Sequence, residues 1–186
     1  MPKTVLPPHE ALYPVPVVLV SCLDKASNEP NIITIAWCGV VCSTPPLISI
    51  SIRPTRYSHK IISESMEFVV NIPKEEQLLL ADSCGMKSGI DVNKFELCGF
   101  TAVPSTKISA PMIKECPVNI ECRVKEVLKL GSHDMFISEV LGVHADSDLL
   151  TDNGNIDFSR ARPFVYNQGE YWGIRKAIGA YGCSRK

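Results

Sequence analysis

One stretch of the sequence combines two arginines with several hydroxyl residues where a helix is expected to begin. It is the eleven-residue run Ser49-Ile50-Ser51-Ile52-Arg53-Pro54-Thr55-Arg56-Tyr57-Ser58-His59. A helix N-terminus has free backbone N–H groups, and arginine beside it completes a site suited to a phosphate group. The same residues also suit a solvated loop with Ser58 as the helix N-cap. The stretch therefore indicates an anion site without identifying the anion.

A second stretch, from Cys84 to Phe95, is rich in glycine, serine and aspartate. Small residues allow a backbone to approach a ligand closely, and Lys94 would add a point charge for a phosphate. The alternative is a compact surface loop with no ligand. This stretch is a second candidate for binding an anion.

Two further segments could contact a ring-shaped ligand. If Asn31–Trp37 is a strand, Asn31, Ile33, Ile35 and Trp37 share one face, which would form either a core strand or a flat ligand wall. His133, in the turn Gly131-Ser132-His133-Asp134, could hydrogen-bond a ligand or act as an acid, although a histidine in a turn is more often simply exposed. His133 is the one weak catalytic candidate, and the catalytic residues are otherwise unknown.

The chain has eight cysteines, and their spacings do not suggest a metal site. They are Cys22, Cys38, Cys42, Cys84, Cys98, Cys116, Cys122 and Cys183. None forms the C-x2-C pattern of zinc sites, so we expect mostly reduced thiols packed as small hydrophobic groups and no metal. Cys38 directly follows Trp37, and a thiol-sensing role there is an alternative hypothesis.

The elements that must position these residues are mostly strands. Apolar and alternating patterns predict strands at Val17–Leu23, Ile32–Val41, Leu47–Ile52, Glu67–Ile72, Val118–Leu130 and Met135–Ala145, the last two forming a hairpin. Helices are expected at Ser58–Ser65 and Lys74–Cys84, with Gly85 as an end signal. Strands and helices do not alternate regularly, and no G-x-G-x-x-G motif follows a strand. A doubly wound parallel sheet is therefore disfavoured, and an antiparallel β-barrel is favoured.

Length and charge limit the classes of function. A chain of 186 residues fits a single domain, here 1–186, with an N-terminal arm at about 1–14 and a C-terminal extension at about 160–186. The net charge of −1, without a basic stripe, argues against nucleic acid. No signal peptide and no apolar run long enough to span a membrane are visible, so we expect a cytoplasmic protein.

Six motifs, in order along the chain, resemble those of the flavin reductase-like, FMN-binding split-barrel family, and within it the flavoredoxins. The resemblance spans roughly residues 14 to 172. The matching motifs are Asn31-x-x-Thr34-x-Ala36-Trp37, Ser49-x-Ser51-x-Arg53 followed by Tyr57-Ser58, Glu67-Phe68-Val69-Val70-Asn71-Ile72-Pro73, Ser88-Gly89-x-Asp91-x-x-Lys94-Phe95, Ala110-Pro111-x-Ile113 and Gly131-Ser132-His133-Asp134.

The resemblance implies a mainly β split barrel that forms a homodimer and binds one FMN per subunit. It implies contacts to FMN from Asn31, Thr34, Ala36, Trp37, Ser51, Arg53, Arg56, Tyr57, Ser58, Asn71, Lys94, His133 and Tyr166. Because the flavin performs the redox chemistry, no acid–base pair is required. We expect an oxidoreductase that moves electrons from NADH or NADPH through FMN to an acceptor. The alternative is a flavoredoxin-type electron carrier with tightly bound FMN, a protein redox partner and little NAD(P)H turnover.

Overall fold

The computed structural model describes residues 1–185 of the chain. It is mainly β, as predicted, with 39% strand and 18% helix. The strands are β1 (Val15–Pro16), β2 (Val18–Asp24), β3 (Glu29–Ile35), β4 (Cys38–Ser43), β5 (Pro46–Ile52), β6 (Glu67–Ile72), β7 (Ala102–Val103), β8 (Met112–Ile113), β9 (Val118–Lys129), β10 (Asp134–Ala145), β11 (Phe164–Asn167) and β12 (Glu170–Gly173). The α-helices are α1 (Tyr57–Ser65), α2 (Leu78–Met86), α3 (Lys94–Cys98) and α4 (Phe158–Ala161), with 3₁₀ turns at Glu75–Gln77 and Ser147–Leu149.

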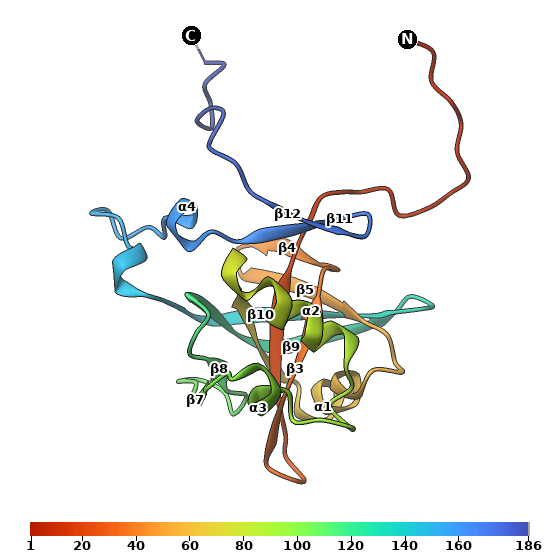
Figure 1. Cartoon of the computed structure of the whole chain (residues 1–186), viewed down its shortest axis with the longest axis vertical. Coiled ribbons are helices and arrows are strands. Elements are labelled where there is room, and N and C mark those ends of the chain that lie inside the picture. The colour runs from red at the N-terminus through yellow and green to blue at the C-terminus, as the bar shows by residue number, and fades with distance from the viewer. Residues whose placement is uncertain (186) are drawn as a thin grey trace.

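A seven-stranded antiparallel sheet forms the body of the molecule. Its strand order is β3-β2-β6-β9-β10-β5-β4, and it curls into a barrel (Figure 1). Inward-facing side chains such as Val20, Ile50, Phe68 and Phe136 are buried and pack into one cluster. Because strand side chains alternate between faces, β2 and β3 also present apolar side chains such as Leu19 and Ile32 outward, where α2 and α3 cover them.

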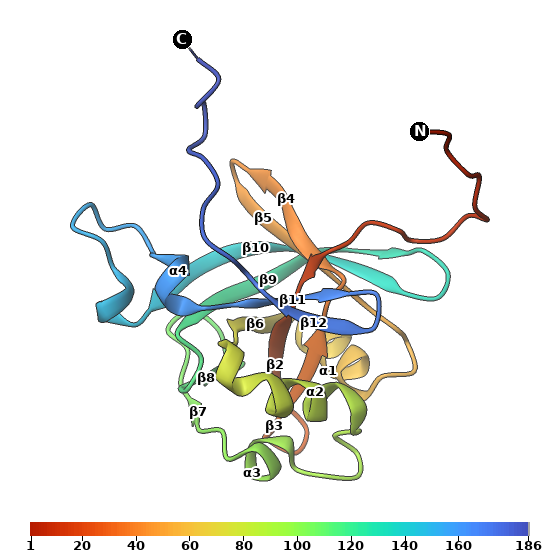
Figure 2. The same cartoon turned by 45° about the horizontal axis from the view of Figure 1, so that its top comes forward.

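The two chain ends project from the end of the barrel at which β11, β12 and α4 lie, whereas α1 and α3 lie at the opposite end (Figure 1). Strand β11 pairs with β1 on one side and with β12 on the other, in a separate three-stranded sheet that crosses the barrel (Figure 2). Among residues 1–185, no helix has both the length and the apolar character needed to cross a lipid bilayer. The proposed limits of the N-terminal arm and C-terminal extension stay a prediction.

Most predicted strands are confirmed, but the strand predicted at Ile32–Val41 is wrong. The chain forms β3, turns at Ala36–Trp37 and then begins β4. In that turn the Cys38 N–H donates to the Ala36 carbonyl at 3.0 Å, which closes a three-residue turn. The apolar residues of this segment contain no signal that predicts a turn. The side chains on either side of the turn consequently depart from simple strand alternation.

Two predicted helix signals are also wrong. Helix α1 begins at Tyr57 with Arg56 as its N-cap, and no side chain caps it. Ser58, the predicted cap, lies one residue inside the helix, and its hydroxyl accepts a hydrogen bond from Asn31 instead. Helix α2 runs through Gly85 and ends at Met86. Gly85 is thus a point of close packing on β3 rather than a helix terminus, since a Cβ there would lie 3.3 Å from Thr34 Cβ.

A buried carboxylate holds the loop that joins β7 to β8. Glu121, in β9, is fully buried. Its side chain accepts hydrogen bonds from the Thr106 N–H at 2.9 Å, the Thr106 hydroxyl at 2.7 Å and the Lys107 N–H at 2.7 Å. His144 Nε2 lies 2.6 Å from the same carboxylate. Burial by itself raises the pKa of Glu121, but these hydrogen bonds outweigh it and lower the pKa to about 2.

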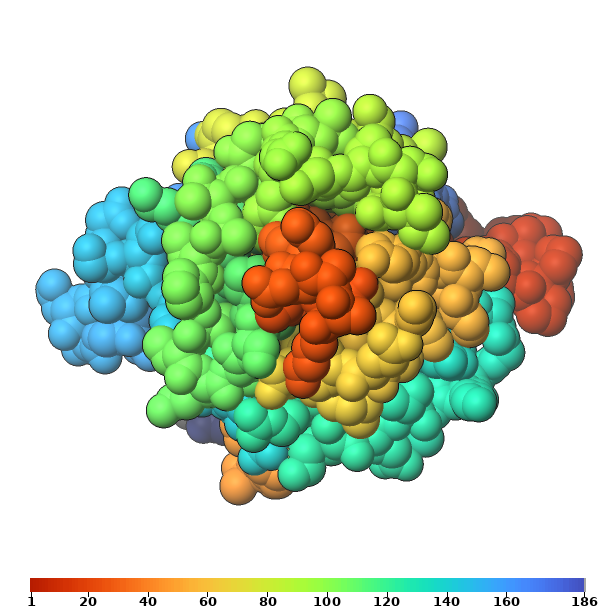
Figure 3. All heavy atoms as spheres, turned by 90° about the horizontal axis from the view of Figure 1, so that it is seen from below, coloured from red at the N-terminus to blue at the C-terminus, as the bar shows by residue number. Residues whose placement is uncertain are grey.

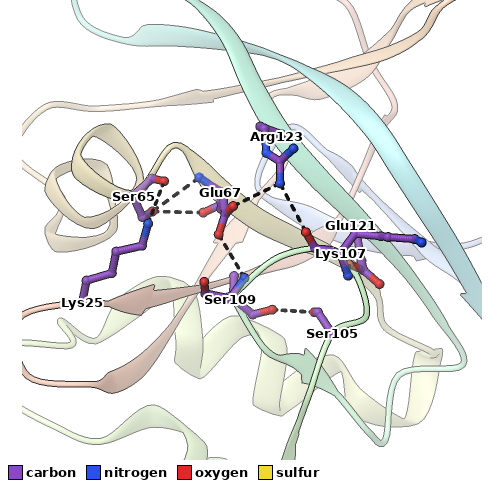
Figure 4. A network of polar contacts seen from close by, with 9 residues as sticks. Lys25, Ser65, Glu67, Ser105, Lys107, Ser109, Glu121 and Arg123 are labelled. Carbon is purple, nitrogen blue, oxygen red and sulfur yellow. Dashed lines mark hydrogen bonds and ion pairs between the residues drawn. The ribbon is translucent and has the colours of Figure 1, made fainter.

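A second carboxylate fastens the same loop nearer to the barrel's edge (Figure 4). Glu67 accepts a hydrogen bond from the Ser109 N–H at 2.9 Å, and Arg123 joins Glu67 to the Lys107 carbonyl at 3.4 and 3.2 Å. This loop has few backbone hydrogen bonds of its own, and the two carboxylates instead accept hydrogen bonds from its backbone N–H groups.

We predict that acid weakens the protein through Glu121. Its pKa is lower in the folded state than the ordinary 4.5, so its stabilising effect is complete above about pH 4.5 and disappears as the pH falls toward 2. Glu121→Gln should lower the free energy of unfolding at pH 7 by about 2 kcal/mol or more, because amide N–H groups would face backbone donors. Urea unfolding at pH 7 and pH 3 measures both effects. A Glu121→Gln protein with an unchanged pH dependence would contradict the assignment.

Candidate functional site

A cleft with two connected chambers lies between β3, α1, α2 and the β11–β12 hairpin. The larger chamber has a volume of about 320 Å³ and the smaller about 100 Å³. Both are lined by Ile33, Arg56 and Gly85, so they form one continuous cleft. Seen from below in Figure 3, the β2–β3 hairpin lies between the segment that contains α1 and the segment that leads to α3.

The larger chamber has apolar walls with a few polar groups. Eight of the predicted site residues line it: Thr34, Ala36, Trp37, Ser51, Arg53, Arg56, His133 and Tyr166. The turn after β3 explains why Thr34, Ala36 and Trp37 reach one cavity although they do not share a strand face. The Thr34 hydroxyl donates to the Ala81 carbonyl in α2, which fixes that wall. Apolar walls with a few fixed polar groups suit a planar ring ligand.

An aromatic cluster surrounds the mouth of this chamber. Tyr166 contacts Trp37, Tyr13 and Tyr171 with ring centroids 6.2, 5.9 and 6.1 Å apart. The Tyr171 hydroxyl donates to Asp82 in α2 at 2.9 Å, which ties β12 to the body across the cleft. Burial and the Asp82 carboxylate raise the pKa of Tyr171 to about 12.

His133 lies against this cluster at the edge of the larger chamber. Its ring stacks on Trp37 at an interplanar angle of 11°, and its Nδ1 is 2.9 Å from the Ser132 hydroxyl. Burial and the charge of Arg53 both lower the pKa of His133 from its ordinary value. The next residue, Asp134, pairs with His59 of α1 at 2.9 Å and so fixes the start of β10. The imidazole can therefore donate or accept one hydrogen bond at the chamber's edge.

The smaller chamber is lined by three cations and by no carboxylate. The cations are Arg56, Lys87 and Lys94, and the Ser58 and Ser88 hydroxyls lie among them. Lys94 is only 4% exposed, and its Nζ donates to the Ile32 carbonyl at 2.8 Å and the Cys84 carbonyl at 2.7 Å. Burial lowers the pKa of Lys94, as expected for an ammonium without a counterion. An ammonium has three donors, so one stays available to a ligand.

Asn31 supports the smaller chamber from behind. Its Nδ2 donates to the Ser58 hydroxyl oxygen at 2.8 Å, and its side chain touches Gly89. A Cβ at Gly89 would overlap the Asn31 amide oxygen. Asn31 thus holds Ser58 and the loop at Gly89 in place instead of lining either chamber.

Two predicted contacts differ from expectation. Asn71 lies far from both chambers' linings, in the core between β2 and β9. Its amide donates to the Leu19 carbonyl at 3.0 Å and the Ser21 hydroxyl at 2.9 Å, and it accepts from the Ile113 N–H at 2.9 Å. These bonds use the amide fully, so the structure makes Asn71 a core residue. Tyr57 does line the smaller chamber, but its hydroxyl donates to Asp24 at 3.0 Å.

Several lining residues were not predicted from the sequence. Val17, Asp82, Met86 and Tyr171 all border the larger chamber. Met86 lies in the stretch from Cys84 to Phe95 that the sequence had already indicated as a candidate binding segment, so it could have been included. Asp82 and Tyr171 are 89 residues apart in sequence and meet only through the folded chain. No local pattern could have identified them.

The comparisons with known proteins assign the chain to a family. The model described as "Flavin reductase like domain" matches residues 11–175. The chain belongs to this family. It is also similar to an uncharacterized protein from Archaeoglobus fulgidus, with 39% identity over 139 residues, 74% of this chain and 77% of that protein.

Solved structures of this family have the same fold. Flavoredoxin of Desulfovibrio vulgaris (Miyazaki F) matches with a TM-score of 0.92 and 31% identity, covering 99% of this chain and 100% of that one. A flavoredoxin from Methanosarcina acetivorans matches with a TM-score of 0.87 and 27% identity, covering 96% and 95%. A protein with a split-barrel domain from Shewanella frigidimarina matches at 20% identity and a TM-score of 0.81, covering 90% and 85%. The predicted split-barrel fold is confirmed.

We predict that position 89 must be a glycine, because there is no room for a side chain beside Asn31. Gly89→Ala should destabilise the protein by about 1 to 3 kcal/mol, because the new methyl group would displace the Asn31 amide from Ser58. Gly39→Ala is the matched control, since a Cβ there has no atom within 4 Å, and should change stability by less than about 0.5 kcal/mol. Chemical unfolding of both variants tests the pair. Equal effects would show that Asn31 does not constrain the loop.

Proposed function

We propose that this chain is an FMN-binding oxidoreductase, with the ring of FMN in the larger chamber and its phosphate in the smaller one. The observation that supports this most strongly is the charge of the smaller chamber, with three cations and no carboxylate among its lining residues. Such a set is costly to leave uncompensated and suits a phosphate dianion. The chamber adjoins a larger apolar one, as a flavin nucleotide requires.

The chain's own residues would bind and orient the cofactor. Ser58, Arg56 and Lys94 would donate to phosphate oxygens, assisted by the free N–H groups in the first turn of α1. Trp37, Thr34 and Ala36 would form the wall against the flavin ring. Tyr166 and Tyr171 would limit the access of water at the mouth. Asn31 would act indirectly, since it fixes Ser58.

A bound flavin supplies hydride and single-electron transfer chemistry that side chains lack. With a flavin bound, the protein would need no catalytic acid, and His133 would serve as a hydrogen-bonding residue at the edge of the larger chamber. As a flavin reductase the protein would take electrons from NADH or NADPH, which would enter the larger chamber transiently. The absence of a G-x-G-x-x-G sequence agrees with a transient rather than a resident pyridine nucleotide.

The second candidate function is electron transfer with a redox protein as partner. It is favoured by the similarity to two flavoredoxins, at 31% and 27% identity over nearly the whole chain. In this case FMN would be held tightly, and NADH or NADPH would reduce it slowly. The same cleft serves either function, because both need only a bound flavin near the surface.

The phosphate chamber predicts a large preference for FMN over riboflavin, which has the same ring but no phosphate. We expect FMN to bind roughly 100-fold more tightly, with an affinity that falls as salt increases. Arg56→Gln should weaken FMN binding about 10-fold and weaken riboflavin binding less, because Arg56 lines both chambers but only FMN carries the phosphate. Lys60→Gln, on the exposed side of the same helix, is the control. Titration of flavin fluorescence measures the affinity of the unmodified protein and of both variants for each flavin. Equal affinities of the unmodified protein for FMN and riboflavin would refute the phosphate assignment.

Anaerobic addition of NADH, and separately NADPH, distinguishes the two candidate functions. Loss of the flavin absorbance within seconds would favour the reductase. A flavin that stays oxidised with both nucleotides, but is reduced by dithionite, would favour the electron carrier. The dithionite step is the control, because it shows that the bound flavin is accessible and competent.

We also propose that the chain acts as a homodimer. In support, the end of the molecule near the cleft exposes several apolar side chains: Trp37, Val40, Val41, Trp172 and Ile174. Figure 2 shows β4 and β12, which contain most of them, on the same end as both termini. A second copy would remove this apolar surface from water. Light scattering should give about twice the mass of one chain, whereas a monomer mass would exclude the dimer.

A further inference from the structure

Two cysteines lie in contact beside the smaller chamber. Cys84, in α2, and Cys98, at the end of α3, have their Sγ atoms 3.5 Å apart. Cys84 is fully buried, and Cys98 is 8% exposed. Both thiols are reduced, and both belong to the cluster that packs α2 and α3 on the barrel. Neither has a role in the cleft as described above.

The chain between these two cysteines forms one wall of the smaller chamber. Gly85, Lys87, Ser88, Gly89 and Lys94 all line it and all lie between Cys84 and Cys98. The Lys94 ammonium also donates to the Cys84 carbonyl at 2.7 Å. Cys84 and Cys98 are therefore placed at the two ends of the segment that surrounds the phosphate position.

We propose that Cys84 and Cys98 form an oxidisable dithiol, and that their disulfide, made by exchange with a low-molecular-weight disulfide, locks the wall of the smaller chamber. A disulfide requires an S–S distance of about 2.05 Å. The two sulfurs already touch, so bond formation needs a local approach of roughly 1.5 Å rather than a refolding of the helices.

The reaction proceeds in two balanced exchange steps. The thiolate of Cys98, the more exposed residue, attacks the small disulfide, forming a mixed disulfide and releasing one small thiol. Cys84, after losing its proton to solvent, attacks the Cys98 sulfur and releases the second small thiol. In total, two protein thiols lose two electrons and two protons, and the small disulfide gains them.

The environment of Cys84 makes it the less reactive of the two thiols toward reagents in solution. Burial raises the pKa of the Cys84 thiol to about 12, and Cys98 adds to that rise, while the charge of Lys94 opposes it. A buried thiol reacts slowly with reagents from solution. Attack within the protein on a sulfur already in contact does not require such access, so Cys98 is the entry point and Cys84 the resolving thiol.

The disulfide would change how readily the wall opens. The segment from 85 to 97 forms one wall of the smaller chamber, so its movement would widen the exit for a bound phosphate. A cross-link at the two ends of the segment removes many of its open conformations. On the proposed function this predicts a slower release of FMN in the oxidised protein, by about 10-fold. It also predicts slower amide hydrogen exchange in residues 87–93, a readout that needs no flavin.

The first experiment maps the bond in protein free of flavin. The protein is incubated with glutathione disulfide, remaining thiols are blocked with N-ethylmaleimide, and the digest is analysed by mass spectrometry. We expect a peptide that joins Cys84 to Cys98. A pair of stable glutathione adducts, or a bond from Cys84 to Cys116 in the same cluster, would overturn the proposal.

The second experiment measures hydrogen exchange and FMN release in reduced and oxidised protein. Cys98→Ala should abolish the effect of oxidation on both, and Cys122→Ala, which removes a buried thiol in the other cluster, should leave it intact. Unchanged exchange in residues 87–93 after the bond has formed would refute the locking of the wall. If FMN fails to bind at all, the proposed function fails, while the mapping and exchange results still decide the dithiol.

Discussion

One buried ammonium joins the elements on which the cleft depends. Lys94 stands at the start of α3, and its Nζ donates to a carbonyl of β3 and to a carbonyl near the end of α2. A buried charge is expensive unless it is compensated, and two neutral carbonyls compensate it only in part. The arrangement therefore favours an anion in the adjoining chamber. It also fixes α2, α3 and β3 relative to one another, which sets the shape of that chamber.

The rest of the site follows from the end of β3. Because the chain turns at Ala36–Trp37, β3 does not run straight on into β4, and both turn residues line the larger chamber. The cleft is apolar at the end near Trp37 and cationic at the end near Lys94. A ligand with a flat ring at one end and a phosphate at the other satisfies both parts. The β11–β12 hairpin then covers the apolar part, held by the hydrogen bond from Tyr171 to Asp82.

Buried polar groups are used in two different ways in this protein. Glu121 and Asn71 have their hydrogen-bonding capacity filled by neighbouring backbone and side chains, so they stabilise the fold and have nothing left for a ligand. Lys94 keeps one donor, and Arg56 forms no ion pair with any residue among 1–185. Whether a polar group has unused hydrogen-bonding capacity therefore separates core residues from site residues better than the type of amino acid does. Asn71 and Asn31 illustrate this, because Asn71 bonds within the core whereas Asn31 holds Ser58 beside the smaller chamber.

Local sequence patterns predicted most of the strands, and the resemblance of six motifs to a known family predicted the split barrel. Alternation along Leu47–Ile52 and across the Val118–Ala145 hairpin depends on local periodicity, and most residues that line the smaller chamber lie in two short stretches of the sequence. Tertiary structure alone decided three things. It placed Asn71 in the core, because a strand residue's face depends on its neighbours in the sheet. It brought Asp82 to Tyr171 and Cys84 to Cys98, because contacts between separate elements leave no local pattern. It ended β3 at Ile35, because a turn stabilised by a backbone hydrogen bond needs no characteristic residue.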